Sequence, residues 1–185
     1  MNFNAHWELK GRHAFLSPSS YHWVDYDEDK LKERYVNSLA KQRGTELHEL
    51  AERCIRLGVK LVNNKNTLNQ FVNDAIGYHM VPEQPLYYSD NCFGTADAIS
   101  FRKGLLRIHD LKTGKVPANM LQLEFYAAMF CLEYGCDPSK IGIELRIYQS
   151  NEVDIVKPEP SRIQDIMDVI VHHDACIDRY KAEGL

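Results

Sequence analysis

Residues 84–112 read QPLYYSDNCFGTADAISFRKGLLRIHDLK, and this stretch decides the fold that we expect for the chain. Runs rich in aromatic and branched residues are typical of strands, and here they are separated by two turn-forming sequences, Ser89-Asp90-Asn91 and Arg102-Lys103-Gly104. The stretch therefore predicts a meander of antiparallel strands. The expected strands are residues 84–89, 92–101 and 105–112.

Helical spacing of apolar residues precedes the meander. From residue 28 to about residue 61, these residues form two helical stripes, one before and one after Gly44-Thr45, and Thr45 is a good candidate to cap the second stripe. A further short helix is expected between residues 63 and 79, entered from Asn66-Thr67.

After the meander, the pattern changes from helix to strand and back. We expect a helix over residues 119–134, strands over residues 141–149 and 153–156, and a last helix that Pro158-Glu159-Pro160 opens and that ends near Lys181. This order of elements predicts a mixed α/β fold with a central mixed β-sheet flanked by helices.

Length and composition fit one globular domain. The chain has 185 residues, of which 44% are hydrophobic and 26% are charged, and no linker is long enough to divide it. We therefore expect a single domain over residues 1–185. Within it, residues 1–29 show turn formers and no sustained period, so they are expected to form an N-terminal arm or lid, and residues 159–182 are expected to form the C-terminal helix.

Membrane, thiol and charge features exclude several classes of protein. No apolar run approaches the roughly 18–20 residues needed to span a bilayer, and the N-terminus lacks the apolar region of a secretory signal, so we expect a cytoplasmic protein without a membrane partner. The five cysteines are scattered without CxxC spacing and are expected to be reduced thiols. The formal net charge of −4 argues against a surface that binds phosphate everywhere, although a local basic groove is compatible with it.

Three charged residues of the meander are expected to converge. Asp110 and Lys112 lie two positions apart on the third strand, so their side chains point to the same face. Asp97 lies on the second strand at a similar distance from the connecting turn, and it lies near Asp110 if the two strands pair. The small and apolar neighbours of Asp97 indicate partial burial, where a lone carboxylate is costly.

This convergence indicates metal-dependent chemistry. Two adjacent carboxylates repel each other, and a divalent cation with oxygen ligands, most naturally magnesium, relieves the repulsion. A metal there can bridge a phosphate oxygen and a water and lower the pKa of that water, while Lys112 can orient the nucleophile or stabilise the charge of the transition state. The three residues therefore predict a site that hydrolyses phosphodiesters.

Four motifs follow one another between about residues 44 and 126. They are GTELHELAE around His48, GTADAI around Asp97, HDLKTGK with Asp110 and Lys112, and QLEFY with Gln122 and Tyr126. In order, spacing and expected secondary structure they resemble the PD-(D/E)XK nuclease superfamily, in its RecB-like exonuclease branch. Because the chain has no helicase motif, it is similar to the compact stand-alone nucleases of that branch, such as those of bacteriophages.

The resemblance implies a restriction-endonuclease-like αβββαβ core over residues 44–149 and a role for each motif residue. The implied metal ligands are His48, Asp97, Asp110 and the backbone carbonyl of Leu111. The implied catalytic residues are Asp97, Asp110 and Lys112, and the implied substrate-binding residues are Gln122 and Tyr126. Mg²⁺ or Mn²⁺ is the implied cofactor, and no iron–sulfur cluster is expected, because the cysteines do not match the pattern of the cluster-binding relatives.

We therefore expect a metal-dependent nuclease that hydrolyses DNA phosphodiester bonds, as an exonuclease in DNA recombination, repair or phage DNA processing. Two other functions stay open: a catalytically silent module of the same fold that binds nucleic acid or a nuclease complex, and an RNA-directed phosphodiesterase. A homo-oligomer and a recombination-protein partner also stay open. Individually, His48 could instead pack beside Leu47 and Ala51, and Gln122 and Tyr126 could be an ordinary hydrogen-bonded pair.

Overall fold

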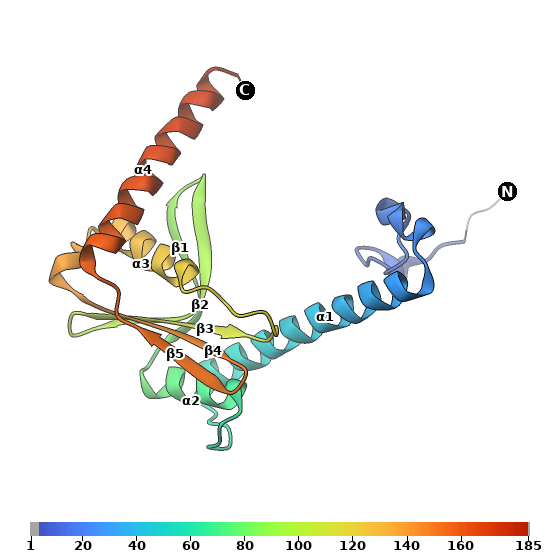
Figure 1. Cartoon of the computed structure of the whole chain (residues 1–185), viewed down its shortest axis with the longest axis horizontal. Coiled ribbons are helices and arrows are strands. Elements are labelled where there is room, and N and C mark those ends of the chain that lie inside the picture. The colour runs from blue at the N-terminus through green and yellow to red at the C-terminus, as the bar shows by residue number, and fades with distance from the viewer. Residues whose placement is uncertain (1–3, 185) are drawn as a thin grey trace. The chain divides into compact units, whose positions relative to one another are not determined.

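The computed structural model describes residues 4–184 (Figure 1). Contacts between residues divide the chain into two compact units, Met1–Thr45 and Glu46–Leu185, and the single domain expected from the sequence stays a prediction. No residue from 4 to 43 is fully buried, so this part supplies no core side chain. All the expected site residues belong to the second unit.

Nine helices and strands make up the regular structure of the described residues, besides short 3₁₀ turns. The strands are β1 (Val81–Ser89), β2 (Cys92–Arg102), β3 (Leu105–Lys112), β4 (Gly142–Gln149) and β5 (Glu152–Val156). The helices are α1 (Glu28–Leu57), α2 (Thr67–Gly77), α3 (Leu121–Tyr134) and α4 (Pro160–Ala182).

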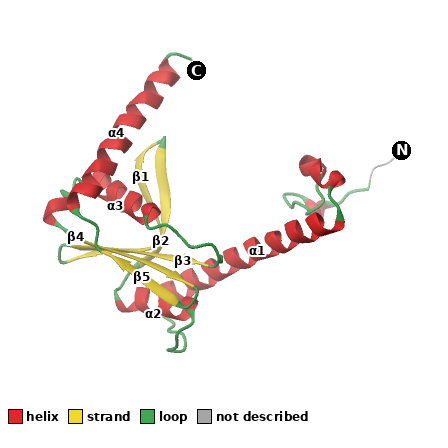
Figure 2. Cartoon of the chain, viewed as in Figure 1, coloured by secondary structure: helices red, strands yellow, loops and turns green. Residues whose placement is uncertain are grey.

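The five strands form one mixed sheet in the order of the sequence. Neighbouring strands pair antiparallel, except β3 and β4, which pair parallel because α3 carries the chain back between them. Helices cover both faces of this sheet (Figure 2). On one face α3 and α4 pack on a core that includes Leu106 and Ile108, and on the other α2 and the last turns of α1 pack around Leu111 and Tyr148.

The mixed α/β fold expected from the sequence is confirmed. Strand β3 has the predicted bounds, and α3 begins two residues later than predicted. The Asn119 side chain accepts a hydrogen bond from the Leu121 N–H, a local turn that keeps Asn119 outside the helix. Strand β1 begins three residues earlier than predicted and contains Pro82 and Pro85. Its edge position accommodates both prolines, since an edge strand has N–H groups that need no partner.

Helix α1 corrects one prediction. The sequence predicts two helical stripes divided at Gly44-Thr45, with Thr45 capping the second, but α1 runs through both residues without a break. The Thr45 hydroxyl donates to the Lys41 carbonyl at 3.3 Å, which is the bond a threonine makes inside a helix rather than at its start. At the start of α2, by contrast, Asn66 does act as the cap and accepts from the Leu68 and Asn69 N–H groups.

The first unit contains two short 3₁₀ helices, Trp7–Leu9 and Pro18–Asp25, and the beginning of α1. The Trp23 indole N–H donates to the Ser17 carbonyl at 2.9 Å. A role of residues 1–29 as an arm or lid stays a prediction. Residues 1–3 of this segment lie outside the described part of the chain. No helix among the described residues is long and apolar enough to cross a membrane. All five cysteines are free.

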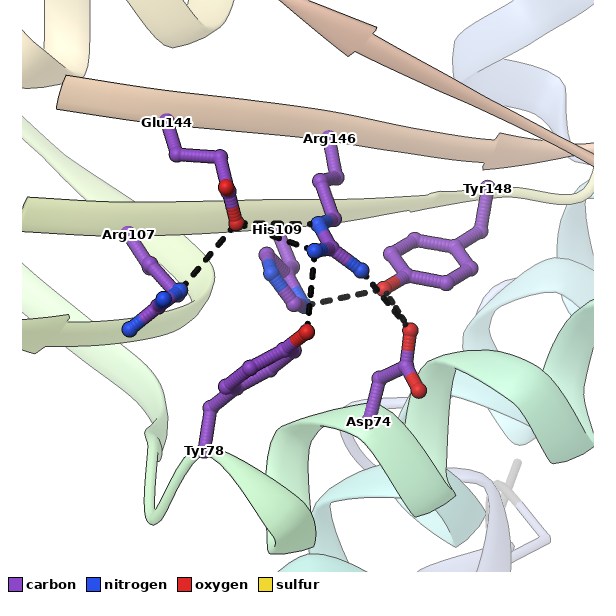
Figure 3. A network of polar contacts seen from close by, with 7 residues as sticks. All are labelled: Asp74, Tyr78, Arg107, His109, Glu144, Arg146 and Tyr148. Atoms are coloured by element: carbon purple, nitrogen blue, oxygen red, sulfur yellow. Dashed lines mark hydrogen bonds and ion pairs between the residues drawn. The ribbon is translucent and has the colours of Figure 1, made fainter.

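A network of polar side chains ties α2 to β3 and β4 (Figure 3). The Arg146 guanidinium lies at its centre, 3.0 Å from Glu144 Oε1 and 3.1 Å from Asp74 Oδ2, and it also donates to the Tyr78 hydroxyl. The Tyr148 hydroxyl donates to Asp74 Oδ2 at 2.7 Å. Arg107 pairs with Glu144 and lies over the Tyr78 ring. His109 shares a hydrogen bond with Tyr148, and its ring packs against the rings of Tyr78 and Tyr148.

His109 shows how this network fixes the third strand. It is fully buried, and burial, aided by Arg146 and Arg107, lowers its pKa to about 3, so the imidazole is neutral in the folded protein. Its neighbour Asp110 points to the opposite face of the sheet, because side chains alternate along a strand. Anchoring His109 from α2 therefore fixes the strand position from which Asp110 projects.

We expect Arg146→Ala to lower the free energy of unfolding by about 3 kcal/mol, because it leaves the carboxylates of Glu144 and Asp74 without their shared cation. Urea unfolding followed by circular dichroism measures the change. Arg162→Ala is the matched control, since Arg162 pairs with Glu124 at the surface and its loss should cost less than about 1 kcal/mol. Equal losses in the two variants would show that the network adds no more than a surface ion pair.

Candidate metal and active site

An irregularity where β1 and β2 pair places two carboxylates opposite each other. Pro82 pairs with Ala98 and Gln84 with Ala96, so Glu83 stands across from Asp97. Glu83 has a φ of +48°, in the left-handed region. Opposite it, at Asp97, the side chains of β2 stop alternating regularly between the two faces of the sheet. Ala96 packs into the core under α3 and α4, whereas Ala98 packs into the core under α1 and α2.

His48 joins these two carboxylates from the last part of α1. Its Nδ1 lies 3.5 Å from Asp97 Oδ2 and 3.9 Å from Glu83 Oε1. One potential ligand atom from each of the three residues lies within 4.8 Å of the others. The side chain is thus part of a polar cluster, and the alternative that His48 simply packs beside Leu47 and Ala51 has less support.

Asp97 is held in place by the backbone of β3. Pairing between β2 and β3 ends at Ala98 and His109, and beyond this pair the Leu111 N–H donates to Asp97 Oδ2 at 2.8 Å. Burial raises the pKa of Asp97 above its ordinary value, against the lowering effects of His48 and of this hydrogen bond. Glu83 adds to the rise, because its negative charge opposes the ionisation of Asp97.

Asp110 and Lys112 form a second cluster beside the first. Lys112 Nζ lies 3.0 Å from Asp110 Oδ2 and donates to Gln122 Oε1 on α3 at 2.9 Å. Asp110 is only 3% exposed, and burial, with a further contribution from Asp97, raises its pKa to about 6, although Lys112 lowers it. Asp97 and Asp110 therefore act on each other electrostatically, as expected from the strand register.

The donor set suits a divalent cation. One imidazole nitrogen and carboxylate oxygens are ligands that Mn²⁺ and Mg²⁺ accept. Burial raises the pKa values of Asp97 and Asp110, so their negative charges are costly, and a nearby cation would offset that cost. His48, Glu83 and Asp97 would hold such an ion. Asp110 is paired with Lys112 and lies outside that group of three, and the role of the Leu111 carbonyl as a ligand stays a prediction.

Asp110→Asn should stabilise the metal-free protein at neutral pH. The pKa of Asp110 is about 6 in the folded protein and 3.8 ordinarily, so ionising it at pH 7 costs about 3 kcal/mol of stability, and asparagine avoids that cost. Because the folded-state pKa is raised, the wild-type protein loses stability as pH rises from about 4 to 6. The stability gained by Asp110→Asn at pH 7 should therefore vanish near pH 4.

Urea unfolding in EDTA at pH 7 and pH 4 measures the free energy of unfolding of both proteins, with the exposed Asp154→Asn as control. A gain of the same size at pH 4 would contradict this explanation.

Gln122 and Tyr126 border a groove next to Lys112. Its volume is about 550 Å³, and β2, α3 and the loop before α3 form its walls. The Tyr126 ring lies so close to Gly94 that a β-carbon on this residue would be 3.1 Å from the ring, which would then have to shift by a few tenths of an ångström. The structure thus brings Lys112, Gln122 and Tyr126 to one surface, as expected for residues near a substrate.

The sequence analysis missed Glu83. This residue precedes the first predicted strand, which was expected to begin at residue 84, so no register could be assigned to it. Two signals could have found it: the edge prolines Pro82 and Pro85, which allow β1 to extend, and the equal distances of Glu83 and Asp97 from the turn after Ser89. Of the expected residues, His48 and Asp97 lie in the same group as Glu83, whereas Lys112 contacts Asp110 and Gln122 beside it and Tyr126 borders the groove.

Comparison with known proteins found no matching family model and no matching curated protein.

Proposed function

We propose that the protein is a metal-dependent nuclease that hydrolyses DNA phosphodiester bonds, acting as an exonuclease in DNA recombination, repair or phage DNA processing. The observation that carries the proposal is the meeting of His48, Glu83 and Asp97 within 4.8 Å, with the Lys112–Asp110 ion pair beside them. A cluster of buried or half-buried carboxylates is costly for a protein that only binds, since each charge must be compensated.

In this proposal, some residues hold the metal ion and Lys112 acts on the substrate. His48, Glu83 and Asp97 would hold Mg²⁺ or Mn²⁺, with Asp110 nearby. A divalent ion in such a site supplies an activated water and polarises a phosphodiester oxygen. Lys112 is held by Asp110 and Gln122, and its charge also acts on Asp97, so it can orient the attacking water and stabilise the charge that develops on the phosphate.

The proposal predicts cleavage of DNA that requires added metal. End-labelled linear DNA and covalently closed circular DNA, each incubated with Mg²⁺, Mn²⁺ or EDTA, give distinct outcomes. An exonuclease shortens the linear DNA from its ends and leaves the circle intact. A cut circle would indicate an endonuclease, and degradation of RNA alone would favour the RNA-directed phosphodiesterase. Binding of DNA without any metal-dependent cleavage would favour the silent module and contradict the proposal.

A further inference from the structure

The groove beside Lys112 has a more apolar surface than a site that binds only phosphates would need. Phe93 and Gly94 of β2 form one wall, and Gln122, Phe125 and Tyr126 of α3 form the other. The lining is mostly apolar and aromatic, and Lys112 is its charged residue. Phe93 is 69% exposed and Phe125 is 37% exposed.

Lys112 joins this groove to the candidate active site. Lys112, whose ammonium group pairs with Asp110, is one of the residues that line the groove, and so is Gln122, which accepts a hydrogen bond from that ammonium group. A molecule lying in the groove is therefore within reach of the group that would act on a phosphodiester. Because Gln122 uses its carbonyl oxygen for Lys112, its NH₂ group is left as a donor for an occupant.

We propose that this groove binds an unpaired nucleotide at the end of a DNA strand, with the base stacked on Phe93 and Phe125. This inference rests on the proposed nuclease function and names its substrate as single-stranded DNA. Flat apolar rings bind the faces of bases, and in a duplex those faces are covered by neighbouring base pairs. A duplex presents mainly phosphates at its surface, and a protein needs several cationic side chains to bind them. The groove has one cationic side chain, that of Lys112.

The size of the groove suits this occupant. A volume of about 550 Å³ lies within the range of sites that hold one small ligand, such as a single nucleotide, whereas a double helix would have to bind outside it. The Tyr126 ring packs closely against Gly94, because glycine has no side chain to hold the ring away from β2. We therefore expect the strand end to be separated from its complement before it reaches Lys112.

Binding in EDTA tests the inference without cleavage. Fluorescence anisotropy of a labelled 12-nucleotide single strand and of the matching duplex gives both affinities for wild type and variants. Phe93→Ala and Phe125→Ala should each weaken single-strand binding about tenfold, which corresponds to about 1.4 kcal/mol, and change duplex binding less than about twofold. Phe101→Ala is the matched control, since Phe101 is an exposed phenylalanine on the same strand outside the groove, and it should change neither affinity.

Two further variants separate stacking from general hydrophobic contact. Phe93→Tyr keeps a flat ring and should bind single strands like wild type, whereas Phe93→Leu keeps apolar area without the ring and should bind like Phe93→Ala. Thermal unfolding checks that each variant is folded. Equal losses for single strand and duplex, wild-type affinity in Phe93→Ala, or full rescue by leucine would each overturn the inference.

The same samples distinguish this inference from the proposed function. Cleavage by wild type with Mn²⁺, together with groove variants that bind single strands normally, would overturn the inference and leave the nuclease proposal intact. Groove-dependent binding of single strands by a wild-type protein that never cleaves would overturn the nuclease proposal alone.

Discussion

Lys112→Ala is expected to lower the rate of DNA cleavage by roughly 100- to 1000-fold, because it removes a charged donor placed to stabilise the transition state. The lysine is no part of the group of three potential ligands, so Mn²⁺ should still bind with an affinity close to that of wild type. The measurements are single-turnover cleavage of end-labelled DNA and calorimetric titration with Mn²⁺.

Two further variants test whether the loss of cleavage in Lys112→Ala is specific to this ammonium group. Lys112→Arg keeps the positive charge but not the compact ammonium group held between Asp110 and Gln122, and it should recover only part of the activity. Lys140→Ala removes an exposed lysine that pairs with Asp137 and should leave cleavage unchanged. If Lys112→Ala cleaves as fast as Lys140→Ala, the lysine is not part of the catalytic machinery.

Asp97→Asn is expected to weaken Mn²⁺ binding about 100-fold, or about 2.7 kcal/mol, and to stop cleavage at ordinary metal concentrations. Asparagine has the same shape as aspartate, and its carbonyl oxygen can still accept from the Leu111 N–H, so the strand contact survives while the charge is lost. Titration calorimetry measures the affinity, and circular dichroism checks the fold.

Glu83→Gln provides a sharper version of this test. Glu83 is placed at the site by the structure rather than by the sequence motifs, and its replacement should weaken Mn²⁺ binding at least about tenfold. Asp154→Asn, on the exposed surface of β5, is the control that removes a carboxylate elsewhere. Wild-type affinity in both Asp97→Asn and Glu83→Gln would show that the cluster does not hold the metal.

Much of the fold was predictable because local signals agree with the tertiary structure. The turns at Ser89-Asp90-Asn91 and Arg102-Lys103-Gly104 fixed the ends of the strands, and Lys103 and Gly104 indeed have positive φ values, as tight turns require. The break predicted at Gly44-Thr45 failed, because the turn preference of these residues is weak against a long helix that continues on both sides.

The site was predictable only where its residues lie on regular strands. The spacing of Asp97 and Asp110 from their common turn brought them together as expected, and the alternation of β3 put Asp110 and Lys112 on one face. Glu83 was missed because it enters through an irregular backbone position on an edge strand, which no periodic pattern reveals. The polar network around Arg146 was missed too, since it joins α2 to strands far away in the sequence.

The most decisive measurement is the rate of DNA cleavage as a function of Mn²⁺ concentration, for wild type and Glu83→Gln side by side. A nuclease whose metal lies among His48, Glu83 and Asp97 should show no cleavage in EDTA, saturable cleavage as Mn²⁺ is added, and a shift of the half-saturating concentration to at least about tenfold higher values in Glu83→Gln. Cleavage that persists in EDTA, or a variant with the same half-saturating concentration as wild type, would contradict the assignment of this cluster as the metal centre.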